Sequence, residues 1–286
     1  MLWYLTPVLQ MPAVPGLTRT FFKRLLGMRL ATLLLSVLAL ASPLTSQAQA
    51  LPAAAISGGP PPQTIVIGFM GGKVSHEDVT RNELIISERL RAAYPRDVHF
   101  EVFENRRLED AHQRVVQLLS NSPGRPLSQL SSQSLQQPLS EQQKRRARII
   151  LFGHSWGASA VVTLANQLQK EGIPVLLTIQ VDSIEKHGQD DAIIPDNVAR
   201  AVNFYQPDGV LHGRPEIHAA NPARTQILGN FRYSYKDAPA ECSVYPWFER
   251  VFIKTHIAIE CDPVLWQRIE GLIRESLGPP QETAAR

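Results

Sequence analysis

Cysteine is scarce in this sequence: only two occur among 286 residues, Cys242 and Cys261. Two cysteines are too few for a disulfide-rich scaffold or a four-cysteine zinc site, and the eight histidines lack the spacing of metal ligands. The chain also contains neither a phosphate-binding glycine loop nor a G-x-G-x-x-G dinucleotide fingerprint. The sequence therefore predicts a protein with no metal and no cofactor.

Acidic residues are absent from the first 50 residues, which hold Arg19, Lys23, Arg24 and Arg29. Subtracting these four from the 29 basic residues of the chain leaves 25, against 26 acidic residues. A nearly neutral remainder of this kind argues against binding of nucleic acid through a basic surface. We therefore expect no nucleic-acid partner.

The N-terminal segment 1–50 has the pattern of a secretory signal peptide. Met28-Arg29 precedes an apolar run over 30–41, and Ala48-Gln49-Ala50 provides a small-residue cleavage site. The run is shorter than the roughly 20 residues that span a membrane. We predict cleavage near Ala50 and export to the periplasm or the medium, with no stable membrane span afterwards. Residues 1–27 then lie upstream of a second potential start at Met28, and an uncleaved N-terminal anchor is the alternative.

In an exported protein the two cysteines are expected to form a disulfide, because disulfides form in oxidising compartments. A bridge between Cys242 and Cys261 would close a loop of about 20 residues, which stabilises a fold by on the order of 3 kcal/mol. The loop contains His256. We predict this disulfide; two free, buried thiols are the alternative.

Composition divides the rest of the chain. Residues 51–63 are rich in glycine and proline and predict a linker. Residues 64–278 have the composition of one globular domain, and 279–286 predict a flexible tail. Within the domain, the stretch 120–143 is dominated by Ser, Gln and Pro, which predicts a disordered insertion.

Short apolar runs alternate with helical patterns along the domain. Such runs are typical of strands buried on both faces, so the alternation predicts an α/β fold with a mostly parallel sheet and helices on both faces. We expect strands over 65–67, 98–103, 148–152, 175–181, 201–205, 226–231 and 251–253, helices over 75–93, 107–119, 157–170 and from Asp262 to a stop at Gly278, and a helical turn at 195–199.

The motif G-H-S-W-G spans Gly153 to Gly157, directly after the strand at 148–152 and directly before a helix. This setting is the one in which a nucleophilic serine, here Ser155, projects its hydroxyl above a sheet. Glycines on both sides let the strand and the helix approach closely. The helix N-terminus would also favour an oxyanion beside Ser155.

On this elbow and on its order of strands and helices, the sequence resembles the α/β-hydrolase superfamily, in particular lipase- and esterase-like members. The resemblance implies an oxyanion hole formed by the backbone N–H of Trp156 and by a second N–H in the loop after the first strand. Phe69 is the expected second donor and Met70 the alternative. Fewer than twenty residues separate Asp182 from the strand at 201–205, which leaves no room there for a large cap domain.

The superfamily's chain order is serine, acid, histidine. His256 comes late in the chain, after the apolar run 251–253 and before a helix, and is the expected base. His212 and His218 are the alternatives. His154 lies inside the elbow, where the ring is expected to pack away from the catalytic face.

Two aspartates compete for the role of the acid. Asp182 ends an apolar strand, and sites in parallel sheets assemble at the carboxyl ends of strands. Asp208 follows the next strand, but Pro207-Asp208-Gly209 is also typical of a plain turn. We favour Asp182 and keep Asp208 as the alternative; Asp262 is expected to cap the last helix.

These residues predict an exported serine hydrolase that acts on small-molecule or lipid carboxylic esters through an acyl-enzyme at Ser155. The same residues would serve a thioesterase, a peptidase or an amidase. Because fold does not fix function, a non-catalytic exported binding protein is the alternative from another class. The sequence does not indicate an oligomeric state.

Overall fold

The computed structural model describes residues 63–72, 77–95, 98–120, 138–186, 188–237, 242, 245 and 247–280. The predicted signal peptide, the start at Met28, nearly all of the linker and most of the C-terminal tail lie outside the described residues. So do positions 121–137 of the predicted insertion and Ser75, the expected start of the first helix. These remain predictions.

Six strands form the central sheet in the order β2-β1-β3-β4-β6-β8, and every neighbouring pair is parallel. A separate parallel pair joins β5 to β7. The predicted parallel α/β sheet is therefore confirmed. The strands are β1 Gln63–Met70, β2 Val98–Glu104, β3 Ala147–His154, β4 Val175–Val181, β5 Ile193–Ile194, β6 Val198–Tyr205, β7 His218–Ala219 and β8 Gln226–Arg232.

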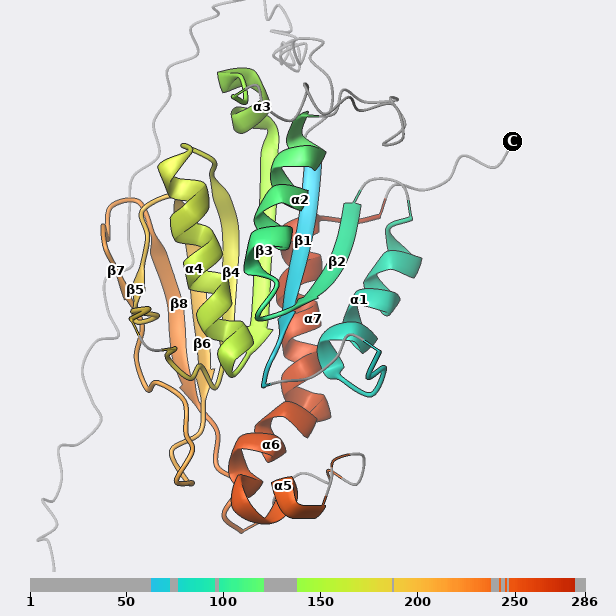
Figure 1. The fold of residues 1–286 in the computed structure, drawn as a ribbon, viewed down its shortest axis with the longest axis vertical. Helices are drawn as coiled ribbons and strands as arrows, with labels where there is room; N and C mark the ends of the chain where they lie inside the picture. Colours follow the sequence, from blue (N-terminus) through green and yellow to red (C-terminus); the bar gives the residue numbers. More distant parts are fainter. Residues whose placement is uncertain are drawn as a thin grey trace, which may run out of the picture. The chain divides into compact units, whose positions relative to one another are not determined.

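Helices cover both faces of this sheet (Figure 1). One face packs against α2 and α4, and the other packs against α1 and α7. The short helices α5 and α6 lie at one end of the sheet (Figure 1). The helices are α1 Asn82–Ala93, α2 Leu108–Ser120, α3 Glu141–Arg146, α4 Trp156–Lys170, α5 Trp247–Phe252, α6 Lys254–Cys261 and α7 Pro263–Leu277.

The two cores follow from the alternation of side chains along each strand. In β1, Ile65 and Ile67 belong to the core shared with α2 and α4, whereas Val66 belongs to the core shared with α1 and α7. In β3, Ile149 and Ile150 divide in the same way. Because both faces are covered, most positions of the central strands are apolar, which explains the apolar runs in the sequence, although polar Thr178, Gln180 and Asn203 are also buried there.

Two of the expected elements differ in the structure. The run 251–253 belongs to helix α5 and its end, not to a strand. Three apolar residues carry no usable period, and the side chain of Val251 is exposed rather than buried in a sheet. The helical turn over 195–199 is shorter than expected: the Val198 N–H donates to the Pro195 carbonyl at 3.1 Å and closes one turn, but β6 already begins at Val198. There the carbonyl of Asn197 accepts from the Val175 N–H at 2.9 Å, so the chain is already paired beside β4.

The end of the predicted insertion is ordered. Leu139 is buried against the core, and Ser140 caps α3. The Ser140 hydroxyl accepts from the Gln143 N–H, while the Gln143 side chain accepts from the Ser140 N–H, a reciprocal capping box. The first helix likewise begins later than expected, at Asn82. The expected stop signals are confirmed: Gly172 and Gly278 follow α4 and α7 with φ of 70° and 81°.

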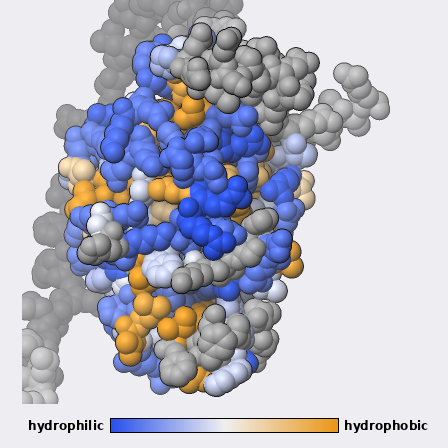
Figure 2. Space-filling view, viewed as in Figure 1, coloured by the Kyte–Doolittle hydropathy of each residue, from blue (hydrophilic) through white to orange (hydrophobic). Residues whose placement is uncertain are grey.

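No large cap domain covers the sheet in the part of the chain that the structure describes, as predicted. None of the described helices has both the length and the hydropathy to cross a membrane. In the view of Figure 1, hydrophilic residues cover most of the surface, and hydrophobic residues form smaller groups, one of them toward the end at which α5 and α6 lie (Figure 2).

Candidate active site

Ser155 occupies the turn between β3 and α4 with φ 57° and ψ −126°. A positive φ is unfavourable for a residue with a side chain and costs on the order of 1–3 kcal/mol. A backbone hydrogen bond to the neighbouring strand holds the turn: the Ser155 N–H donates to the Val181 carbonyl at the end of β4, at 2.9 Å. This hydrogen bond stabilises the strained conformation of Ser155. The turn places the serine hydroxyl above the carboxyl end of the sheet.

The glycines around this turn allow very close packing. A Cβ on Gly157 would lie 2.2 Å from the Phe69 carbonyl oxygen, and one on Gly153 would lie 2.7 Å from the Gly157 backbone. A Cβ on Gly71 would lie 2.9 Å from the Ser155 Cβ. No side chain fits at these positions, so the elbow requires glycine for contact with β1 and for its own turn.

A continuous series of hydrogen bonds links three of the predicted residues. His256 Nε2 lies 2.9 Å from Ser155 Oγ, and His256 Nδ1 lies 2.6 Å from Asp182 Oδ2. His256 sits in the first half of α6, not in the loop that the sequence predicted, and all three residues are buried. The structure thus brings together the expected nucleophile, base and acid from β3, α6 and the end of β4.

Asp182 is held by backbone and side-chain donors. Its Oδ1 accepts from the N–H groups of Gln206 and Gly213 at 3.0 and 2.7 Å, and its Oδ2 accepts from Gln206 Nε2 at 2.9 Å. Sequence reasoning did not identify Gln206 or Gly213. The one available signal for Gln206 is its position directly after β6, the neighbour of β4 in the sheet.

The competing acid, Asp208, has other partners. Its carboxylate accepts from Ser234 Oγ at 2.6 Å and from the Tyr235 N–H at 3.0 Å. The Ser234 hydroxyl is the main reason why the pKa of Asp208 lies below its ordinary value. Asp208 thus joins the end of β6 to the segment after β8. Asp262 caps α7 as expected, accepting from the Val264 N–H at 2.9 Å.

Neither alternative histidine contacts these groups in the described structure. His218 lies in β7 with its side chain 60% exposed, and its nearest acidic neighbour is Glu216. His212 Nδ1 lies 3.3 Å from the Gly213 carbonyl oxygen.

The expected oxyanion donors come from the first residue of α4 and the last two residues of β1. Trp156 begins α4 and lines the cavity beside the serine. Phe69 lies inside β1, paired with Phe103 and Gly153, and Met70 ends that strand. Gly71 and Gly72, one and two residues further on, line the cavity. Sequence reasoning began this loop at Gly68 and ended it at Gly72; its start was too early, because β1 continues to Met70.

A cavity of about 520 Å³ opens at Ser155. Its polar walls include His256 and His154, and its apolar walls come from several segments far apart in the sequence. The apolar lining residues are Trp156, Ile184, Leu211, Ile253 and Ile257. The charged residues Asp78, Arg81 and Glu260 also line the cavity. A space of this size suits a ligand of small-molecule size that has both an apolar and a polar part.

Burial keeps His256 in its basic form. Removal from water lowers the pKa of His256 below its usual value, and this effect outweighs the hydrogen bond that His256 donates to Asp182, which raises the pKa. Repulsion from His154 lowers the pKa further. A neutral imidazole with Nδ1–H directed at a carboxylate leaves Nε2 free to accept the proton of the serine hydroxyl. The arrangement can therefore activate Ser155 as a nucleophile.

The predicted disulfide is confirmed. Cys242 and Cys261 are bonded, with their Cα atoms 5.7 Å apart. Cys261 is the last residue of α6, the helix that carries His256. The bond therefore ties the end of this helix to the chain before α5.

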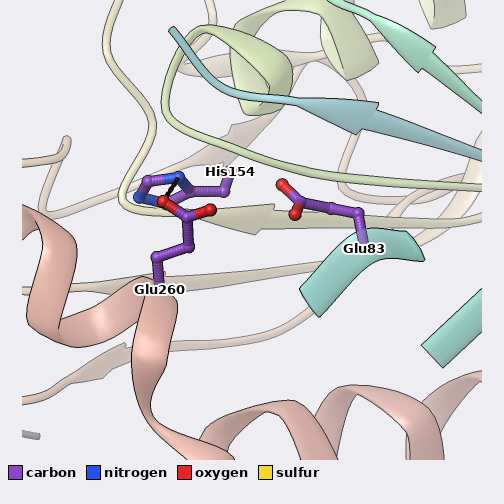
Figure 3. Close-up of side chains that lie close together, drawn as sticks. All are labelled: Glu83, His154 and Glu260. Carbon is purple, nitrogen blue, oxygen red and sulfur yellow. Dashed lines mark ion pairs between the residues drawn. The ribbon is translucent and has the colours of Figure 1, made fainter. Parts of the chain in front are cut away.

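Beside Ser155 lies a buried charged cluster, formed by Glu83, His154 and Glu260 (Figure 3). His154 Nδ1 lies 3.2 Å from Glu260 Oε2, and Arg81 Nη1 lies 2.9 Å from Glu260 Oε1. The His154 ring does not pack away from the catalytic face as expected; its centroid lies 4.7 Å from that of His256. We assign no metal ligand in this cluster, although its donor atoms lie within 4.8 Å of one another, because Arg81 already supplies a cation to Glu260.

No model of a known protein family matches the chain, and no curated protein matches it. Among solved structures, the chain is similar to a cutinase-like protein from Cryptococcus sp., with 14% identity, 77% of this chain and 97% of that one covered, and a TM-score of 0.40. It is also similar to a putative hydrolase of the alpha/beta superfamily from Xanthomonas campestris pv. campestris, with 14% identity, 74% and 99% covered, and a TM-score of 0.30. A type II thioesterase from the yersiniabactin biosynthetic pathway matches at 13% identity over 44% of this chain and 45% of that one, with a TM-score of 0.22. The α/β-hydrolase-type fold rests on this chain's own strand order and on the serine turn between β3 and α4.

Proposed function

We propose that this chain is an exported serine hydrolase that acts on carboxylic esters through an acyl-enzyme at Ser155. The observation that carries the proposal is the hydrogen-bonded series from Ser155 Oγ through His256 to Asp182. A serine hydroxyl is a weak nucleophile until a base removes its proton, and the base needs an acid to hold its tautomer. Both partners are present at hydrogen-bonding distance.

In the proposed reaction, Ser155 Oγ attacks the ester carbonyl carbon while His256 Nε2 takes the hydroxyl proton. The tetrahedral intermediate collapses when His256 returns this proton to the departing alkoxide, which leaves as the alcohol. Water then attacks the acyl-enzyme with His256 again as the base, and the carboxylic acid departs. The Asp182 carboxylate stabilises the imidazolium in both steps.

The developing oxyanion needs fixed donors. We assign one to the Trp156 N–H, at the N-terminus of α4, where the helix dipole also favours negative charge. The loop after β1 would supply the second. Phe69 and Met70 remain candidates, and the lining of the cavity by Gly71 and Gly72 favours a donor slightly later in this loop.

The walls of the cavity support the proposed substrate class. Five apolar side chains line it, and its size fits a short or medium acyl group. No large cap encloses the site among the described residues, so the alcohol part of the ester could extend into solvent. Thioesters and amides would meet the same catalytic groups, so they belong in the test.

Export is supported by two independent features. The N-terminal sequence has the charged, apolar and small-residue parts of a signal peptide. The bond between Cys242 and Cys261 is of a kind that persists in oxidising compartments.

The test is covalent labelling of the full chain, purified as the cell processes it, with a fluorophosphonate, read by intact mass. A single adduct that is absent from Ser155→Ala would demonstrate an activated Ser155. Hydrolysis of p-nitrophenyl esters, matched thioesters and matched anilides by the same sample would then rank the substrate classes. A folded protein without any adduct would favour the non-catalytic binding protein instead.

A further inference from the structure

The buried charged cluster and the neighbouring Arg81 carry charges that the proposed reaction does not use, although Arg81, His154 and Glu260 line the cavity at Ser155. Arg81, Glu83, His154 and Glu260 come from the start of α1, the end of β3 and α6, and each is at most 8% exposed. Burying a charge is costly unless it is paired. A fold that keeps four such groups beside its active site has each of them in a defined ionisation state.

Glu260 is the fixed anion of the cluster. Arg81 Nη1 contacts both of its oxygens, at 2.9 and 3.1 Å, and His154 Nδ1 lies 3.2 Å from Oε2. The guanidinium of Arg81 also lies over the Tyr245 ring, 4.2 Å from its centroid, which restrains its position. Burial alone would raise the pKa of Glu260, but His154 and Arg81 together hold it below its usual value.

Glu83 is in the opposite situation. Both of its carboxyl oxygens are buried and have no hydrogen-bond partner among the described residues, and they face His154 and Glu260 (Figure 3). Burial, with repulsion from Glu260, raises the pKa of Glu83 to about 8. Near pH 7 this side chain is therefore a neutral acid, and it does not compete with Glu260 for the nearby cations.

His154 connects this cluster to the catalytic base. Its ring lies against that of His256, with centroids 4.7 Å apart and planes inclined by 32°. Burial opposes protonation of His154, but the Glu260 carboxylate overcomes this and raises the pKa of His154 above its usual value. The groups that face His154 are Glu260 and His256 from α6, Glu83 from α1, Arg81 before α1 and Asp182 after β4.

We propose that His154 is a positioning residue for His256: held as an imidazolium by Glu260, its ring fixes the plane of the catalytic ring and its charge keeps that ring neutral. This inference rests on the proposed function, in which His256 is the base. A cation beside an imidazole disfavours a second cation there. His256 thus takes up a proton only when Ser155 supplies one and Asp182 stabilises the product.

The test is an NMR titration of the histidine side chains, with ¹⁵N shifts that distinguish imidazolium from neutral imidazole, in the full chain and in His154→Asn. Asparagine retains a donor near the position of Nδ1, so Glu260 keeps a partner, but the charge and the ring are lost. We expect His154 to be an imidazolium at pH 7 in the wild type. In His154→Asn we expect the pKa of His256 to rise by about one unit.

The matched control is Glu83→Gln, an isosteric change in the same cluster. Glutamine has the charge of the protonated glutamic acid, so we expect the pKa of His256 to remain at its wild-type value. A change of the same size in both variants would point to loosened packing rather than to the charge of His154, and would overturn the proposal.

Two further results would overturn it. A neutral His154 at pH 7 in the wild type, which requires no variant and no folding control, removes the charge on which the inference depends. A divalent metal found at one equivalent in the purified wild type and lost in Glu83→Gln would show that a bound ion supplies the positive charge. Elemental analysis of both proteins distinguishes this case.

The fluorophosphonate experiment tests the proposed hydrolase independently of the role of His154. With no adduct at Ser155 but with the expected titrations, the proposed hydrolase is wrong and the coupling of the two histidines stands. With an adduct, the rate of labelling in His154→Asn should fall about tenfold on the acidic side of the profile and little above it, as a one-unit rise in the pKa of the base requires.

Discussion

The backbone N–H of Gly213 donates to Asp182 Oδ1 at 2.7 Å, and a Cβ on this glycine would lie 2.3 Å from the same oxygen. A main-chain atom of one loop therefore touches the carboxylate that orients His256. The contact leaves Asp182 no space to move toward residue 213, and it requires glycine for reasons of space alone, since Gly213 is not among the glycines with positive φ.

We expect Gly213→Ala to displace Asp182 and reduce kcat by about 10²-fold, because a shift of about 1 Å in a catalytic group has effects of this size. Overpacking should also lower the free energy of unfolding by about 1–3 kcal/mol. Ester hydrolysis and thermal unfolding measure the two effects. The control is Gly271→Ala in α7, where a Cβ would meet nothing within 4 Å. Equal activity of the two variants would contradict the assigned contact.

Asp182→Asn should lower kcat by about 10³- to 10⁴-fold, because asparagine cannot hold the tautomer of His256 that accepts the serine proton. Asp208→Asn removes the same charge from the other candidate acid. We expect it to keep most of the activity and to lose some stability, since Asp208 accepts from Ser234 and from the Tyr235 N–H. Steady-state kinetics on one ester compares the two variants. A larger loss of kcat in Asp208→Asn than in Asp182→Asn would assign the role of the acid to Asp208.

The pH dependence follows from the lowered pKa of His256. Because the base must be neutral to act, kcat/KM should be constant near neutral pH and fall as the pH drops through a midpoint below about 6.5. The rate of fluorophosphonate labelling, measured from pH 4 to 8, checks this without an acyl substrate. His218→Asn, at an exposed histidine, should give the same profile. A midpoint clearly above 6.5 would be inconsistent with a buried, neutral base.

Removal of the disulfide should act on both stability and activity. We expect Cys242→Ser with Cys261→Ser to lose on the order of 3 kcal/mol in the free energy of unfolding, from the release of a closed loop with a sequence separation of 19. Activity should fall too, because the loop carries His256. Chemical denaturation of the variant, and of wild type treated with a reductant, gives the comparison. An unchanged midpoint in both samples would show that the bond adds nothing to the fold.

The central strands were predictable because burial on both faces of the sheet favours apolar residues at consecutive positions. Ile149, Ile150 and Leu151 are fully buried, and no sequence period was needed to find them. The serine turn was predictable for a related reason: Gly153 and Gly157 are imposed by contacts within and beside their own strand and helix. Both features are local, so a short window of sequence contains their cause.

The surroundings of Asp182 were not predictable in this way. Gln206 and Gly213 follow it by 24 and 31 residues, and neither has a local reason to be there. The contact of His154 with His256 joins residues much further apart in the sequence, and nothing in G-H-S-W-G indicates that Glu260 would pair with His154. Helix α5 was missed because three apolar residues fit a strand as well as a helix.

The three proposed catalytic residues enter the fold at different stages of synthesis. Ser155 and Asp182 stand on neighbouring central strands, but His256 follows Asp182 by 74 residues and arrives on a helix near the end of the chain. A ribosome that has made the sheet as far as β8 has made a nucleophile and an acid but no base. On the proposed mechanism, a nascent or truncated chain would therefore be catalytically silent until its last two helices are in place.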